Sequence, residues 1–131
     1  MLAKRKVMDF KAPFVNPFII MDTEFTSWAG SQQRGWTGEG EYREIVQIGA
    51  IKVDPQQNFT EVDSLNTLVR PVINPYLSDY FTDLTHISQE QVDENGVLFA
   101  QGLETFNNFC DTLDVWSYGR DDKVLLENCR L

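Results

Sequence analysis

One short segment constrains the fold of this chain more than any other: residues 19–25, which read Ile-Ile-Met-Asp-Thr-Glu-Phe. Its apolar start predicts a strand over residues 18–25, and its two acids, Asp22 and Glu24, are two positions apart. Side chains alternate along a strand, so both carboxylates share one face, roughly 6–7 Å apart. Neighbouring buried acids repel each other, and their hard oxygen atoms suit a divalent cation. The segment therefore predicts a metal site; a strand end with two solvated acids is the alternative.

The length of 131 residues suits one domain with a single core. We expect a folded domain over residues 18–131 and, over residues 1–17, a basic arm that carries Lys4, Arg5, Lys6 and Lys11. No apolar stretch follows these cations, so the arm is not a secretory signal, and no run is long enough to span a membrane. Cys110 and Cys129 lack metal-type spacing and fall on expected helices, which predicts reduced core thiols and a cytoplasmic protein.

The composition narrows the possible nucleic-acid partners. Hydrophobic residues make up 42% of the chain, as in an ordinary globular protein. The formal net charge of −9 argues against broad binding of duplex nucleic acid through a basic surface. A metal-dependent nuclease remains possible, because such an enzyme concentrates acids at its centre and meets phosphates through its metals.

The pattern beyond the first strand predicts a mixed α/β sheet. Stretches rich in β-branched or alternating residues predict strands over 44–53 and 59–69, and a turn at 54–58 joins them. Three consecutive strands with such connections form an antiparallel meander. A short fourth strand over 114–118 follows a helical crossover, so we expect it to run parallel to the first strand and beside it.

Helices and one long loop account for the rest of the chain. Helices are expected over residues 77–84, 89–92 with Ser88 as its N-cap, 99–113 and 123–129. The apolar stripe of the third of these predicts packing against the core. Segment 26–42 holds four glycines among polar residues, so we expect a long exposed loop directly beside the paired acids.

Four segments, taken in order, resemble the DEDD-type 3′–5′ exonucleases (the DEDDh group) in their RNase T and Eri-like branch. The first is Asp22-Thr23-Glu24, and the second is 44–50, Glu-Ile-Val-Gln-Ile-Gly-Ala. The third lies within residues 70–92 and includes Leu-Thr-His-Ile-Ser-Gln-Glu-Gln-Val; the fourth, 116–121, reads Trp-Ser-Tyr-Gly-Arg-Asp. The resemblance covers nearly all of the chain from Phe18 onward. It implies an RNase H-like fold with flanking helices and a two-metal hydrolysis of phosphodiester bonds, with Mg²⁺ or Mn²⁺.

The resemblance also implies roles for particular residues. Asp22 is expected to bridge the metals, Glu24 to hold one of them and orient the water, and Asp121 to add the ligand of the second motif. Asp122 is the alternative ligand. We favour Asp121, because a helix that starts at Asp121 places Leu125 and Cys129 on the same face. The terminal nucleotide is expected to contact residues that follow the first motif, with two loop residues as weaker candidates: Phe25, Thr26 and Trp28, then Arg34 and Trp36.

The family's general base is a histidine of a third motif, histidine-x-alanine-x-x-aspartate. The only histidine, His86, precedes the middle helix, where relatives usually carry glycine, so we do not expect it to be that base. Nothing after Asp121 supplies the motif, and we expect a domain whose C-terminal part is missing.

These features predict an impaired 3′–5′ exonuclease that acts on single-stranded ends of RNA or DNA. The alternative is a non-catalytic protein of the same fold that binds nucleic acid or a protein partner. We also expect an exposed edge on the fourth strand, and such edges invite self-association.

Overall fold

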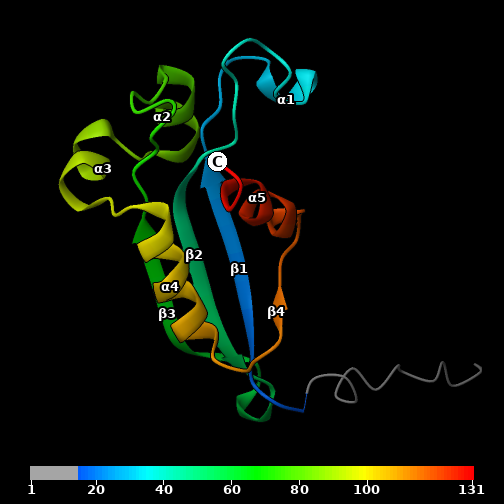
Figure 1. The fold of residues 1–131 in the computed structure, drawn as a ribbon. Helices are drawn as coiled ribbons and strands as arrows, with labels where there is room; N and C mark the ends of the chain where they lie inside the picture. Colours follow the sequence, from blue (N-terminus) through cyan, green and yellow to red (C-terminus); the bar gives the residue numbers. More distant parts are fainter. Residues whose placement is uncertain (1–14) are drawn as a thin grey trace, which may run out of the picture.

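The computed structural model describes residues 15–131, which form a mixed α/β fold around one four-stranded sheet (Figure 1). The strands, in chain order, are β1 (Phe18–Phe25), β2 (Ile45–Asp54), β3 (Thr60–Leu68) and β4 (Val115–Trp116). A 3₁₀ turn, η1 (Pro55–Gln57), joins β2 to β3. The helices are α1 (Ser31–Arg34), α2 (Asp79–Thr85), α3 (Gln89–Asn95), α4 (Phe99–Cys110) and α5 (Asp121–Asn128).

The sheet order, β3-β2-β1-β4, confirms the predicted topology. β1, β2 and β3 form the antiparallel meander, and β4 pairs with β1 in parallel, with Ile20 opposite Trp116. β4 is only two residues long, shorter than the predicted strand at 114–118. The edge of β1 beyond Ile20 therefore has no strand partner on the β4 side within the described residues.

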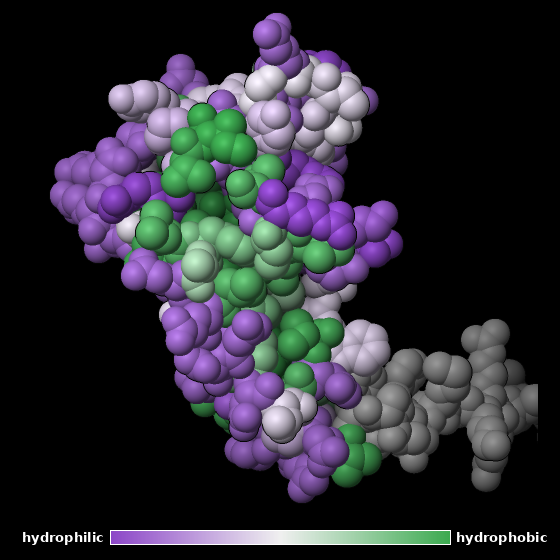
Figure 2. Space-filling view, in the orientation of Figure 1, coloured by the Kyte–Doolittle hydropathy of each residue, from purple (hydrophilic) through white to green (hydrophobic). Residues whose placement is uncertain are grey.

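α4 and α5 cover the same face of the sheet, α4 over β2 and β3 and α5 over the end of β1 (Figure 1). The buried β1 side chains on this face, Ile19 and Met21, pack with Phe106 and Cys110 of α4 and Val124 of α5. Figure 2 shows apolar side chains gathered along the middle of this face, between polar surfaces. The predicted apolar stripe of the third helix is therefore part of the core.

A second, smaller apolar cluster holds α2 and α3 against the start of β2. Its buried members are Val46, Phe81, Ile87 and Val92. Serine hydroxyls begin both helices: Ser78 accepts a hydrogen bond from the Phe81 N–H, and Ser88 forms a capping box with Gln91. The predicted N-cap at Ser88 is confirmed.

Two predictions about burial are wrong. Segment 26–42 is not fully exposed, because it contains α1 and buries the hydroxyls of Thr26, Ser27 and Ser31. Cys129 is exposed, unlike the buried Cys110, because α5 ends at Asn128 and Cys129 lies beyond its apolar face.

The arm predicted over residues 1–17 lies almost entirely outside the described residues. No helix within residues 15–131 is long and apolar enough to cross a membrane.

Candidate active site

Asp22 and Glu24 lie on the face of β1 that points away from α4 and α5. The residue between them, Thr23, is buried on the helix side, whereas Asp22 is exposed and Glu24 half-buried. Across the ladder, Gly49 of β2 lies opposite Asp22 and Gln47 lies opposite Glu24. The strand alternation thus gives both carboxylates one face, and the missing side chain at Gly49 leaves space beside Asp22.

Asp121, the first residue of α5, is buried and lies at the open edge of β1. Its Oδ1 accepts hydrogen bonds from the Thr23 main-chain N–H at 2.9 Å and from the Thr23 hydroxyl at 2.6 Å. Because β4 stops at Trp116, this N–H has no strand partner, and Asp121 occupies the position. Asp122, in contrast, is exposed and forms a bidentate ion pair with Arg120 at 2.9 Å.

The three carboxylates Asp22, Glu24 and Asp121 influence one another electrostatically. The pKa of Asp22 is raised above its usual value, first by burial and then by the charge of Asp121. The pKa of Glu24 is raised by burial, then by Asp22 and by Asp121. Asp22 and Glu24 thus lie where an added positive charge is favoured.

The carboxylates of the described residues do not form a preassembled metal-binding group. No three His, Cys, Asp or Glu side chains within residues 15–131 are arranged to hold one ion together, and Asp121 is turned toward Thr23. None of the ion pairs in this part of the chain involves Asp22 or Glu24. The donors are nevertheless all carboxylate oxygens, as Mg²⁺ and Mn²⁺ prefer. A divalent cation fits these donors, because its charge offsets the burial and the repulsion that together raise both pKa values.

A pocket of about 150 Å³ opens beside Glu24. Phe25, at the end of β1, and Trp36, from the loop after it, line one side, with ring centroids 5.3 Å apart and a tilt of 60°. Tyr80 and Leu84 line it from α2, and polar atoms come from Ser27, Ser31 and Gln32. A small pocket with aromatic walls beside a carboxylate suits a flat polar ring such as a nucleobase.

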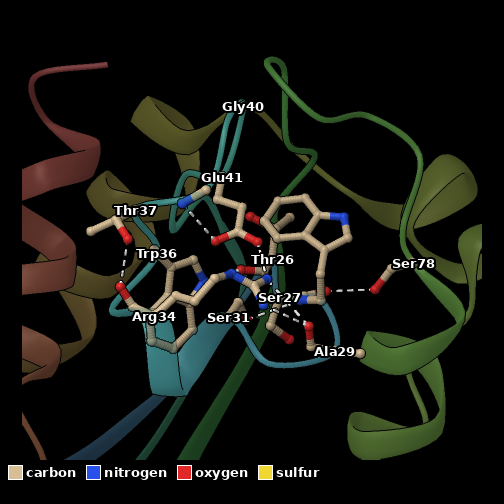
Figure 3. Close-up of polar contacts among 12 residues, drawn as sticks. Thr26, Ser27, Ala29, Ser31, Arg34, Trp36, Thr37, Gly40, Glu41 and Ser78 are labelled. Atoms are coloured by element: carbon tan, nitrogen blue, oxygen red, sulfur yellow. Dashed lines mark hydrogen bonds and ion pairs between the residues drawn. The ribbon is translucent and has the colours of Figure 1, made fainter.

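Hydrogen bonds within the loop hold the aromatic side of this pocket in place (Figure 3). The Trp36 indole N–H donates to the Thr26 carbonyl at 2.9 Å, and the Thr37 hydroxyl donates to the Arg34 carbonyl at 2.7 Å. Arg34 also donates to the Ala29 carbonyl at 3.2 Å and forms an ion pair with Glu41. The loop therefore has an ordered conformation that is held by its own hydrogen bonds.

The predicted substrate residues occupy three different environments. Phe25 and Trp36 line the pocket. The Thr26 side chain is buried and its hydroxyl donates to the Tyr42 carbonyl at 2.6 Å, which gives this side chain a structural role. Trp28 is half-buried, is not among the described residues that line the pocket, and donates its main-chain N–H to Ser31 Oγ at 3.0 Å.

His86 lies at the C-cap of α2 with a left-handed backbone, φ 61°. Glycine is favoured in this conformation because it has no Cβ to clash. His86 therefore ends α2, a position at which glycine would be free of strain.

Four residues around the site were missed by sequence reasoning: Arg43, Glu44, Tyr80 and Leu84. The Arg43 guanidinium lies 5.9 Å from the Phe25 ring centroid and 5.6 Å from that of Trp36. It also forms an ion pair with Glu127 of α5. Of these four residues, only Glu44 had a sequence feature that could have identified it: it is a charged residue at the start of an apolar predicted strand.

The topology and the acids at the end of β1 define an α/β nuclease-type domain. The exonuclease family RNase_T matches residues 19–130, and the chain belongs to that family. A curated relative, ERI1 exoribonuclease 2 from Xenopus laevis, is 33% identical over 100 residues, which are 76% of this chain and 13% of the relative. The chain thus spans a small part of that protein.

Solved structures share the fold. The nuclease domain of 3′hExo, a DEDDh family member bound to rAMP, superposes with a TM-score of 0.75 at 24% identity, over 89% of this chain and 60% of that one. Cell-death related nuclease 4 gives a TM-score of 0.70 at 20% identity, over 90% and 42%. The family match confirms the RNase T exonuclease assignment made from the motifs, and the likeness to the solved structures confirms the fold.

Proposed function

We propose that this chain is a divalent-metal-dependent 3′–5′ exonuclease domain that acts on single-stranded ends of RNA or DNA. One observation carries the proposal: Asp22, Glu24 and Asp121 lie within electrostatic reach of one another, and Glu24 also lines the adjoining aromatic pocket. A metal-dependent hydrolase needs acids to hold its cations beside the place where the substrate end is bound.

In this proposal the three carboxylates hold Mg²⁺ or Mn²⁺, which supplies charge stabilisation and an activated water. Asp22 would be a ligand of the metals, and it interacts electrostatically with Asp121 and Glu24. Glu24, which lines the pocket, would help to hold a metal and to orient the attacking water. Asp121 completes the set once its carboxylate turns from Thr23.

The pocket supports the single-stranded part of the proposal. A base that inserts between Phe25 or Trp36 and the α2 side chains cannot remain stacked and paired in a duplex. Base stacking on an aromatic side chain contributes about 1–3 kcal/mol. Two of the similar proteins are an exoribonuclease and a nuclease domain bound to rAMP, which supports a ribonucleotide end as the first substrate to test.

The experiment is a single-turnover nuclease assay with Mn²⁺ and excess protein, using 5′-labelled single-stranded RNA and DNA. We expect a slow ladder that shortens one nucleotide at a time, because we assign no general base within residues 15–131 and a positioned base contributes on the order of 10²–10⁴ in rate. Asp22→Asn and Asp121→Asn are expected to abolish the ladder. Asp122→Asn is the matched control and is expected to retain it. Immediate release of a labelled 5′ mononucleotide contradicts the proposed direction.

The second candidate is a non-catalytic protein that binds nucleic acid. It is favoured by one observation, that no three metal-ligating side chains within residues 15–131 form a ready group. Mn²⁺-dependent binding of the oligonucleotide without hydrolysis, lost in Asp22→Asn, identifies this function. Neither binding nor hydrolysis by the native chain overturns both candidates.

A further inference from the structure

Glu44, the residue before β2, is a buried carboxylate held entirely by main-chain groups. Its side chain is 3% exposed. Oε1 accepts a hydrogen bond from the Asn74 N–H at 2.6 Å, and Oε2 accepts from Val72 at 2.7 Å and Ile73 at 2.8 Å. No ion pair within residues 15–131 involves Glu44. Successive N–H groups form a nest for an anion, and here the chain's own carboxylate fills that nest.

The main chain of Glu44 is bonded to the end of β1. The Thr26 N–H donates to the Glu44 carbonyl at 2.9 Å, and the Glu44 N–H donates to the Thr26 hydroxyl at 3.1 Å. Thr26 follows Glu24 and Phe25, the two β1 residues that line the pocket. One residue therefore connects the loop side of the pocket to segment 72–74.

Segment 72–74 leads directly into the other side of the pocket. The Asn74 side chain donates to the Gly40 carbonyl at 2.9 Å, which adds a second link to the loop. Four residues later, the Ser78 hydroxyl donates to the Ser27 carbonyl at 2.5 Å (Figure 3). Ser78 begins α2, which carries Tyr80 and Leu84. The spacing between α2 and the loop thus depends on what fixes segment 72–74.

We propose that Glu44 is a positioning residue that sets the separation of the two walls of the nucleotide pocket. Glu44 is not among the described residues that line this pocket, so it acts through Thr26 and through segment 72–74. The inference rests on the proposed function, because it assumes that the pocket binds a nucleotide. It goes further in placing pocket shape under the control of a residue outside the acidic centre.

The variant Glu44→Gln tests the proposal with little change in volume. Its amide group turns one acceptor into a donor that faces main-chain N–H groups, so the nest can no longer close. Adenosine 5′-monophosphate is titrated into the full chain with Mn²⁺ and followed by tryptophan fluorescence. We expect the Kd for the nucleotide to rise about tenfold, because the walls must be ordered on binding.

The affinity for Mn²⁺ separates positioning from general damage. Asp22 and Glu24 are held by β1 itself, so calorimetric titration of Mn²⁺ alone is expected to give the same Kd in Glu44→Gln and the native chain. Phe106→Leu, a core change on α4, is the control for lost stability and is expected to bind the nucleotide as the native chain does. Equal nucleotide affinity in Glu44→Gln and the native chain overturns the inference. Parallel loss of nucleotide and Mn²⁺ affinity also overturns it.

Amide hydrogen exchange decides the case in which Glu44→Gln does not fold. In the native chain we expect the nucleotide to slow exchange at Val72, Ile73 and Asn74 relative to the amides of α4. Unchanged exchange at these three amides overturns the inference. Failure of the native chain to bind the nucleotide at all overturns the proposed function instead, so the two failures are distinguishable.

Discussion

At the scale of single residues, the carboxylates at the end of β1 repel one another. Asp22 and Glu24 gain their raised pKa values from burial and from neighbouring carboxylates, and no described cation pairs with either. A raised carboxyl pKa means that the folded state binds the proton more tightly than the unfolded state. Stability therefore falls as pH rises from about the usual values, 3.8 for Asp22 and 4.5 for Glu24, through the raised ones.

The residue-scale prediction follows from this loss of stability with rising pH. Without metal near neutral pH, Asp22→Asn is expected to raise the Tm, because it removes a charge that the fold disfavours. At a pH below the usual aspartate value the two proteins are expected to melt together. Mn²⁺ is expected to raise the Tm of the native chain by linkage and to leave Asp22→Asn unchanged.

Differential scanning calorimetry across this pH range, with and without Mn²⁺, makes the measurement. Asp122→Asn is the control, because its pKa shift has the opposite direction: Arg120 lowers the pKa of Asp122 to about 2. Removing the Asp122 charge is therefore not expected to raise the Tm. A native Tm that does not respond to Mn²⁺ argues against Asp22 as a metal ligand.

At the scale of elements, α5 is the critical one, because it carries Asp121 to the open edge of β1. Its far end is tied to the start of β2 by Asn128. The Asn128 side chain accepts from the Ile45 N–H at 2.9 Å and donates to the Arg43 carbonyl at 2.7 Å. The ion pair between Arg43 and Glu127 adds a second link. These links hold the helix although β4 beside it is very short.

The element-scale prediction is that Asn128→Ala lowers the free energy of unfolding by about 1–3 kcal/mol. The change leaves the Ile45 N–H and the Arg43 carbonyl without their partner in a half-buried place. Urea unfolding followed by circular dichroism measures the difference. Asn108→Ala, at an exposed position of α4, is expected to change stability little. Equal stability of both variants contradicts the role given to Asn128.

At the scale of the whole molecule, the two edges of the sheet differ. β3 carries the exposed acids Glu61 and Asp63 along its edge, which oppose pairing with another chain. β4 instead exposes Val115 at 42% and Trp116 at 52%, and Ile20 beside it is 40% exposed. An apolar edge beside an apolar patch favours contact with a second copy, whereas the net charge of −9 opposes it.

The whole-molecule prediction is weak self-association that strengthens with added salt, as salt screens the net charge. Sedimentation velocity at rising protein concentration measures it. Val115→Lys is expected to shift the chain toward monomer, and Val62→Lys on β3 is the matched control that should not. A monomer at every concentration, or an equal effect of both variants, rules out the β4 edge as the contact.

Local sequence determined much of the secondary structure of this protein and the family to which it belongs. Residues 18–25 form the predicted strand to the residue, because apolar content and alternation act within a few positions. The Ser88 cap and the apolar stripe of α4 are local in the same way. The order of the motifs was sufficient to assign the family, because an ordered set of segments is specific where one acidic pair is not.

Tertiary structure decided what joins distant segments. Asp121 meets Thr23 across 98 positions, and the length of β4 left that place open to it. The amides that hold Glu44 lie 28 to 30 positions away, and no local pattern marks them as its partners. Thr26 lies just after the first motif, yet its hydroxyl donates a hydrogen bond to the Tyr42 carbonyl within the loop. Propensity and periodicity report on neighbours in sequence, whereas these bonds depend on where the folded chain brings main-chain donors together.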